Sequence, residues 1–233
     1  METRLHLDIL PQPDDLTCGP TCLHAVYRYY GDEVPLEQVI AESRSLEEGG
    51  TLAVFLGCHA LKRGYRATMY TYNLDLFDPT WFGSRPADLT EKLTAQREAK
   101  TDPRLRVQTP GYLEFLRLGG RIRFADLTSG LLRRYLSAGV PILTGLSATY
   151  LYHTVREYGF ECVDDDVRGF PAGHFVVVSG YDRKRRRVLV ADPHERNPLT
   201  GNLHYEVDVP RLIGSILLGI VTHDANLLIL EKS

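Results

Sequence analysis

The chain has 233 residues, of which 43% are hydrophobic and 24% are charged, and its formal net charge is −3. This length suits one large domain with a sizeable core, and the charge gives no reason to expect a nucleic-acid partner. The N-terminus lacks the apolar run of a secretory signal, and no segment is long and apolar enough to cross a bilayer. We therefore expect a cytoplasmic protein without a membrane segment.

The chain carries four cysteines, Cys18, Cys22, Cys58 and Cys162, which are too few for a disulfide framework. No C-x2-C pair indicates a zinc site, and the acidic run Asp164–Asp166 lacks nearby residues at metal-ligand spacing. We therefore expect reduced thiols and no metal or cofactor.

Residues 4–9 alternate apolar and polar side chains, which predicts a short edge strand. A turn rich in proline and aspartate begins at Gln12, and apolar residues then recur at helical spacing. Thr17 is a favourable N-cap residue, so we predict a helix that begins at Cys18 and ends before Gly31. Cys18 would then lie at the positive end of the helix dipole, where a nucleophilic thiolate is stabilised.

Gln12 precedes Cys18 by six residues, and Gly19-Pro20 follows the cysteine. This Q-x5-C-G-P pattern resembles the start of papain-like cysteine peptidases, and more narrowly the bacterial family that processes double-glycine leader peptides of bacteriocins. The resemblance implies that Cys18 is the nucleophile and that Gln12 stabilises the oxyanion beside the Cys18 backbone N–H. Without a transporter segment, we expect a free-standing relative. The alternative is a buried structural cysteine, which is how we interpret Cys22.

The sequence over residues 35–73 predicts two helices followed by a strand. We predict a helix over residues 35–41 with a proline in its first turn, and a second helix that Thr51 caps and Gly64 ends. Residues 65–73 are aromatic and β-branched with alternation, which predicts a strand.

The segment at about 84–120 is polar and helical in pattern. Because Pro103 and Pro110 interrupt it, we expect two helices, the second from Tyr112 to Leu118. We interpret this segment as a helical insertion into a single peptidase domain that spans residues 1–233. It is either a solvated helical pair or a wall of the substrate cleft.

After the insertion, residues 121–124 predict a short strand. Thr128 or Ser129 caps a predicted helix from Leu131 to Leu136. Residues 140–146 form an apolar run typical of a buried strand.

A long connection over residues 147–173 leads to a predicted β-hairpin. Its strands are residues 173–181 and 188–193, and both are strongly apolar. The turn over residues 182–187 carries five consecutive basic residues, which we interpret as a solvated hairpin tip rather than a phosphate site.

The hairpin brings a histidine and an aspartate together. If Val178 pairs with Val188, His174 pairs with Asp192, and a register slip of two residues still leaves the carboxylate within diagonal reach of the imidazole. His174 would take the thiol proton of Cys18, and Asp192 would fix the tautomer of His174.

The chain order of cysteine, histidine and aspartate is that of papain-like enzymes, and the G-H-F-V-V-V and A-D-P motifs resemble the leader-peptidase family. His153 and His194 are rival bases. We predict the catalytic set Gln12, Cys18, His174 and Asp192.

Residues 203–210 and 226–231 predict further strands, with a short helix over residues 211–217 between them. The predicted fold is α+β and papain-like, with an N-terminal helical side packed on a mostly antiparallel sheet. We expect a cysteine peptidase or amide-bond hydrolase that acts on a peptide or protein. The alternatives are a papain-like acyltransferase or amidase, and a non-catalytic peptide-binding domain.

Overall fold

A mixed β-sheet forms the centre of the computed structural model, which describes residues 2–46, 49–159, 161–222 and 224–232. The strand order is β3-β2-β10-β4-β7-β8-β9, and β1 also pairs with β7. The β2–β3 pair is parallel and the other pairs of this sheet are antiparallel. The strands are β1 (Glu2–Arg4), β2 (Arg66–Thr71), β3 (Arg121–Arg123), β4 (Ile142–Ser147), β7 (Gly173–Asp182), β8 (Arg187–Ala191), β9 (His204–Asp208) and β10 (Asn226–Glu231).

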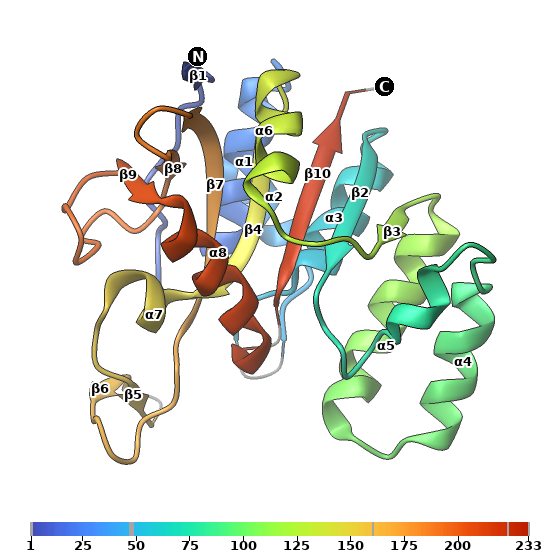
Figure 1. The fold of residues 1–233 in the computed structure, drawn as a ribbon. Coiled ribbons are helices and arrows are strands. Elements are labelled where there is room, and N and C mark those ends of the chain that lie inside the picture. Colours follow the sequence, from blue (N-terminus) through green and yellow to red (C-terminus); the bar gives the residue numbers. More distant parts are fainter. Residues whose placement is uncertain (1, 47–48, 160, 223, 233) are drawn as a thin grey trace.

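Helices cover both faces of this sheet (Figure 1). The first face carries α1 (Cys18–Tyr29), α2 (Leu36–Glu42), α3 (Ala53–Lys62), α4 (Leu89–Ala99) and α5 (Pro103–Arg117). The second carries α6 (Ser129–Ser137), α7 (Ala148–Tyr152) and α8 (Val209–Leu218). Each face has its own apolar cluster, because side chains of the central strands alternate between the two. The predicted α+β fold with an N-terminal helical side is confirmed.

Several predicted elements form at or near their expected bounds. Cys18 is the first residue of α1, β4 is buried along its whole length, and β10 spans residues 226–231. Thr128 caps α6 as expected, because its hydroxyl accepts the Leu131 N–H. The predicted bounds of the first strand are wrong, because β1 covers residues 2–4 rather than 4–9.

The cap of α3 differs from the prediction. The Thr51 hydroxyl donates to the Arg44 carbonyl, and the N-cap residue is Leu52. The free N–H of Ala53 instead donates to the carboxylate of Asp224, at 2.7 Å. The buried Asp224 comes just before β10, so a residue distant in sequence supplies the cap.

The predicted second helix of the segment over residues 84–120, which was expected to begin after Pro110, is also wrong. Pro103 lies in the first turn of α5, but Pro110 lies inside that helix and does not end it. A proline inside a helix costs about 3 kcal/mol. Tyr112 and Phe115 are buried beside α3, and burying each large apolar side chain contributes roughly 1.5–3 kcal/mol, which offsets this cost. Packing therefore keeps the helix intact. Figure 1 shows α4 and α5 at the β2–β3 end of the sheet.

The hairpin of β7 and β8 forms with a different register. Val178 pairs with Val190, not with Val188, and the register shifts at a bulge between Val178 and Gly180. The long connection before β7 also contains structure that the sequence did not predict. This comprises α7, β5 (Glu157–Tyr158), β6 (Val163–Asp164) and the β5–β6 ladder. Elsewhere, the short helices η1 (Pro79–Phe82) and η2 (Gly219–Thr222) complete the described elements.

None of the helices in the described part of the chain combines the length and the apolar character that a bilayer crossing requires.

Candidate active site

The predicted nucleophile lies where the sequence placed it, in the first turn of α1. Cys18 is buried, with 9% of the residue exposed. Gly19 beside it cannot be replaced without a shift, because a Cβ there would lie 2.5 Å from Thr51 Cγ2 and 3.2 Å from the Phe175 ring. The glycine of the C-G-P motif therefore lets α1 approach both the start of α3 and the strand that carries His174.

Cys22, one turn further along α1, also holds this helix against β7. Its fully buried thiol donates to the carbonyl of Phe175, at 3.2 Å. Phe175 directly follows His174 in β7. The interpretation of Cys22 as a core residue behind Cys18 is confirmed, and the structure adds a positioning contact that the sequence did not reveal.

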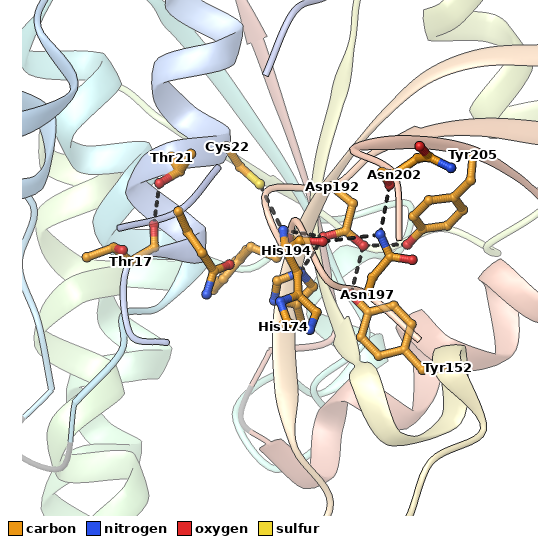
Figure 2. Close-up of polar contacts among 12 residues, drawn as sticks. Thr17, Thr21, Cys22, Tyr152, His174, Asp192, His194, Asn197, Asn202 and Tyr205 are labelled. Carbon is orange, nitrogen blue, oxygen red and sulfur yellow. Dashed lines mark hydrogen bonds and ion pairs between the residues drawn. The ribbon is translucent and has the colours of Figure 1, made fainter. Parts of the chain in front are cut away.

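His174 and Asp192 face each other at the same end of the β7–β8 hairpin (Figure 2). The Nε2 atom of His174 lies 2.8 Å from Asp192 Oδ1. Asp192 directly follows β8, and the register of the hairpin sets the two residues diagonally rather than directly opposite. The structure thus brings His174 and Asp192 together as expected, in the diagonal pairing that a register shift of two residues produces.

The Asp192 carboxylate is fully buried and accepts four hydrogen bonds (Figure 2). Besides His174, the backbone N–H of His194 donates to Oδ1, at 2.9 Å. The hydroxyls of Tyr152 in α7 and Tyr205 in β9 both donate to Oδ2. Both carboxylate oxygens are therefore fixed, and with them the plane of the carboxylate.

Two tyrosines in this arrangement were missed by sequence reasoning. Tyr205 occupies an inward position of the alternating strand β9, which indicates burial but no partner. Tyr152 ends a short helix that the sequence did not predict. The loop after Asp192 is held by the buried Asn197, whose side-chain amide donates to the carbonyls of His194 and Asn202.

The electrostatics of the pair favour an imidazolium beside a carboxylate. Burial lowers the pKa of His174, but the charge of Asp192 and hydrogen bonds to Asp192 and Cys18 raise this pKa by more, to about 10. For Asp192, burial raises the pKa, and the His174 charge with the hydrogen bonds from His174, Tyr205 and His194 lowers it below its ordinary value. Each partner therefore stabilises the charged form of the other.

Cys18 lies close enough to this imidazole to raise the pKa of His174. Because Nε2 is engaged by Asp192, Nδ1 is the ring nitrogen that remains for the thiol. The arrangement can transfer a proton between sulfur and imidazole while the carboxylate holds the ring.

Gln12 is tied to the same loop as the acid. Its backbone N–H donates to the Pro193 carbonyl, at 2.9 Å, next to Asp192. Its side-chain Nε2 donates to the Asp14 carbonyl, at 2.8 Å. A primary amide carries a second N–H besides the one that the Asp14 carbonyl accepts.

The rival bases lie differently. His153 is exposed at the end of α7, in the left-handed conformation. His194 is close to the site, with its ring centroid 6.2 Å from that of His174, but its contact with Asp192 uses the backbone N–H. Of these three histidines, it is His174 whose ring binds the buried carboxylate of Asp192.

The pKa values of the thiols of Cys22, Cys58 and Cys162 are all raised. Burial raises the pKa of Cys22 well above its ordinary value, and it raises that of Cys58 to about 12. The pKa of Cys162 is raised by burial and by Glu157.

Comparisons with known proteins bear on this arrangement. Residues 126–209 match the model of the "Peptidase_C39 like family", and this segment includes His174 and Asp192. No curated protein matches the chain at a significant level.

Three solved structures are similar to the chain at low sequence identity. A putative C39-like peptidase from Bacillus anthracis is similar with a TM-score of 0.54 and 14% identity, over 100% of this chain and 98% of that chain. Xylellain, a cysteine protease from Xylella fastidiosa, has a TM-score of 0.48 and 13% identity, over 100% and 86% of the two chains. A double glycine motif protease from an AMS/PCAT transporter, in complex with the leader peptide, has a TM-score of 0.47 and 15% identity, over 99% and 95%.

The predicted resemblance is confirmed: residues 126–209 match the C39-like peptidase family, and the chain shares the fold of a C39-like peptidase.

Proposed function

We propose that the chain hydrolyses peptide bonds through a Cys18–His174–Asp192 triad with Gln12 in the oxyanion hole. The Cys18 thiolate attacks the scissile carbonyl, and the tetrahedral oxyanion binds the Gln12 side-chain amide and the Cys18 backbone N–H. The His174 imidazolium then protonates the leaving amine, which yields a thioester. Neutral His174 next removes a proton from water, and the hydroxide releases the acid product and Cys18.

One observation carries this proposal. The His174 imidazole binds a fully buried carboxylate through Nε2, and the cysteine that begins α1 lies close enough to raise the pKa of that imidazole. A histidine that only stabilised the core would need no such cysteine, and a structural cysteine would need no such imidazole. Asp192 stabilises the imidazolium that proton transfer from sulfur creates.

The substrate is proposed to be a peptide or protein. The resemblance to the double-glycine family favours small residues before the scissile bond, such as Gly-Gly or Gly-Ala. We therefore propose an extended peptide substrate with two small residues at that position.

The experiment that tests this function is peptide cleavage followed by mass spectrometry. We expect the wild-type chain to hydrolyse members of a peptide library in which residue pairs before the cleavage site vary, and Cys18→Ala to leave them intact. Adding a primary amine separates hydrolysis from acyl transfer, because a transferase would yield mostly the amide product. A chain that binds library peptides and cleaves none would refute the proposal and favour a binding domain.

Asp192→Asn should move the alkaline limb of kcat/KM to lower pH. The carboxylate raises the pKa of His174 to about 10, so the imidazolium persists up to that pH in the wild-type chain. Asparagine can still accept the ring N–H, but it removes the negative charge, so the imidazolium loses its proton at lower pH. The measurement is kcat/KM between about pH 5 and pH 10.5.

Asp166→Asn is the matched control, since Asp166 is exposed and belongs to the loop before β7. It removes the same charge and should leave both limbs in place. An unchanged alkaline limb in Asp192→Asn would show that His174 does not set it.

A further inference from the structure

The turn between β7 and β8 forms a basic surface that the proposed catalysis does not use. Residues 183–186 of this turn are exposed. The turn contacts the start of α8, because the Arg186 carbonyl accepts the Val209 N–H at 3.1 Å. Arg186 itself adopts a φ of 54°, a left-handed conformation that few arginines take.

An open hollow of about 500 Å³ lies between this turn, α7 and α8. Its lining consists of Tyr150, Arg185, Arg186, Asp208, Pro210 and Arg211. Arg211 is already ordered, because its Nη1 donates to the Tyr150 carbonyl at 2.7 Å and its guanidinium lies 5.0 Å from the centroid of the Tyr150 ring. Binding a ligand there would therefore require little further ordering of the Arg211 side chain.

The charges of this surface are only partly neutralised. Arg185 pairs with Glu206 at 2.8 Å, and Arg187 lies between Glu206 and Asp208. The ion pairs among the described residues include none to Arg183, Lys184 or Arg186. The surface therefore carries positive charge without a carboxylate partner, on a chain whose net charge is −3.

We propose that this hollow, which we call the basic hollow, binds an acidic stretch of the polypeptide substrate; this rests on the proposed function. Guanidinium groups bind carboxylates in a planar, two-bonded geometry. Tyr150 and Pro210 supply apolar surface for a peptide backbone. Glu206 and Asp208 stand among the arginines and would repel a closely spaced run of phosphates, so a few carboxylates fit better than a nucleic acid or an anionic membrane.

The separation between His174 and the basic turn sets how long the substrate must be. His174 stands at one end of β7 and the basic turn follows the other end, and β7 contains ten residues. At about 3.3 Å per residue, His174 and the arginines of the turn are separated by roughly 30 Å, while Tyr150 at the other end of the basic hollow is two residues from Tyr152, which bonds Asp192. An extended substrate that runs along the basic hollow must therefore continue for about nine residues beyond the scissile bond before its acidic stretch reaches Arg185 and Arg186.

Direct binding tests the basic hollow apart from catalysis. The probe is a fluorescein-labelled peptide of alternating Glu and Ser, with a Gln and Ser peptide as its neutral partner, titrated against the full chain carrying Cys18→Ala. We expect the acidic probe to bind at least about tenfold more tightly than the neutral one at low salt, and added salt to weaken it. Arg186→Glu with Arg211→Glu should weaken it roughly tenfold.

The control is Arg97→Glu with Arg106→Glu, which changes the net charge equally at exposed positions of α4 and α5. It should leave binding unchanged. Because Arg211 also contacts α7, a second variant, Arg183→Glu with Lys184→Glu, alters only exposed side chains of the turn and should weaken binding as well. Equal binding of the two probes, or equal loss in the control, would overturn the proposal. Displacement by single-stranded DNA or anionic vesicles of equal charge at lower concentration would overturn it too.

Cleavage separates this inference from the proposed function. The variant Arg186→Glu with Arg211→Glu should cleave a short neutral peptide at the wild-type rate and lose roughly tenfold in kcat/KM on the same peptide with a distant acidic extension. Equal cleavage of both peptides by this variant and the wild type would refute the basic hollow alone. If no peptide were cleaved by the wild-type chain, the proposed function would fail, while the binding titration would still decide what the basic hollow binds.

Discussion

His174→Ala should lower peptide hydrolysis by a factor on the order of 10⁴ or more, because it removes both the base and the acid of the reaction. The same change should slow alkylation of Cys18 by a small reagent at about pH 6, since the thiolate loses its imidazolium partner. Both losses are expected in one variant because a single ring serves both steps. The measurements are the rate of peptide cleavage and the labelling of each cysteine by mass spectrometry.

His194→Ala is the matched control. Its ring is removed, but the backbone N–H that donates to Asp192 remains, so the carboxylate should stay in place. Cleavage and labelling should stay near the wild-type values. In the wild-type chain Cys18 should be labelled first, because the pKa values of Cys22, Cys58 and Cys162 are all raised. Loss of activity in His194→Ala rather than in His174→Ala would move the base to the neighbouring histidine.

Local patterns were enough to predict the elements that carry the candidate site. The start of α1 at Cys18 follows from a turn and a helical apolar stripe, both of which are readable within twenty residues. The meeting of His174 and Asp192 follows from alternation along two strands joined by a short turn. Such predictions succeed because the partners are close in sequence and the geometry of a hairpin is nearly fixed.

The remaining features depend on contacts between distant segments. Asp224 caps α3 across 171 positions of sequence, and no local pattern around Thr51 or Ala53 could indicate it. Tyr152 and Tyr205 converge on Asp192 from a helix and a strand on either side of it in the chain. Val178 pairs with Val190 rather than Val188, and side-chain alternation cannot detect this difference, since a shift of two residues preserves the faces. The bulge between Val178 and Gly180 adds a further shift of one residue towards the turn, which depends on local backbone geometry.

Gln12→Ala should lower kcat by about 10²–10³ while leaving KM and the alkylation rate of Cys18 nearly unchanged. Apart from its bond to the Asp14 carbonyl, the Gln12 amide would bind the oxyanion, which exists in neither the bound substrate nor the alkylation reaction. The loop should keep its place, because its bond to the Pro193 carbonyl comes from the backbone N–H, which alanine retains. A change confined to kcat therefore separates stabilisation of the oxyanion from binding of the peptide.

Gln12→Glu sharpens this prediction. Glutamate has nearly the same shape as glutamine, but at neutral pH its carboxylate donates no hydrogen bond. It should lose at least as much kcat as alanine, because a negative charge beside the oxyanion adds repulsion to the missing donor. The decisive comparison is hydrolysis and Cys18 alkylation for both variants beside Cys18→Ala. If Gln12→Ala cleaved at the wild-type rate, the oxyanion would have to be held without Gln12, and the six-residue spacing to Cys18 would carry no catalytic meaning.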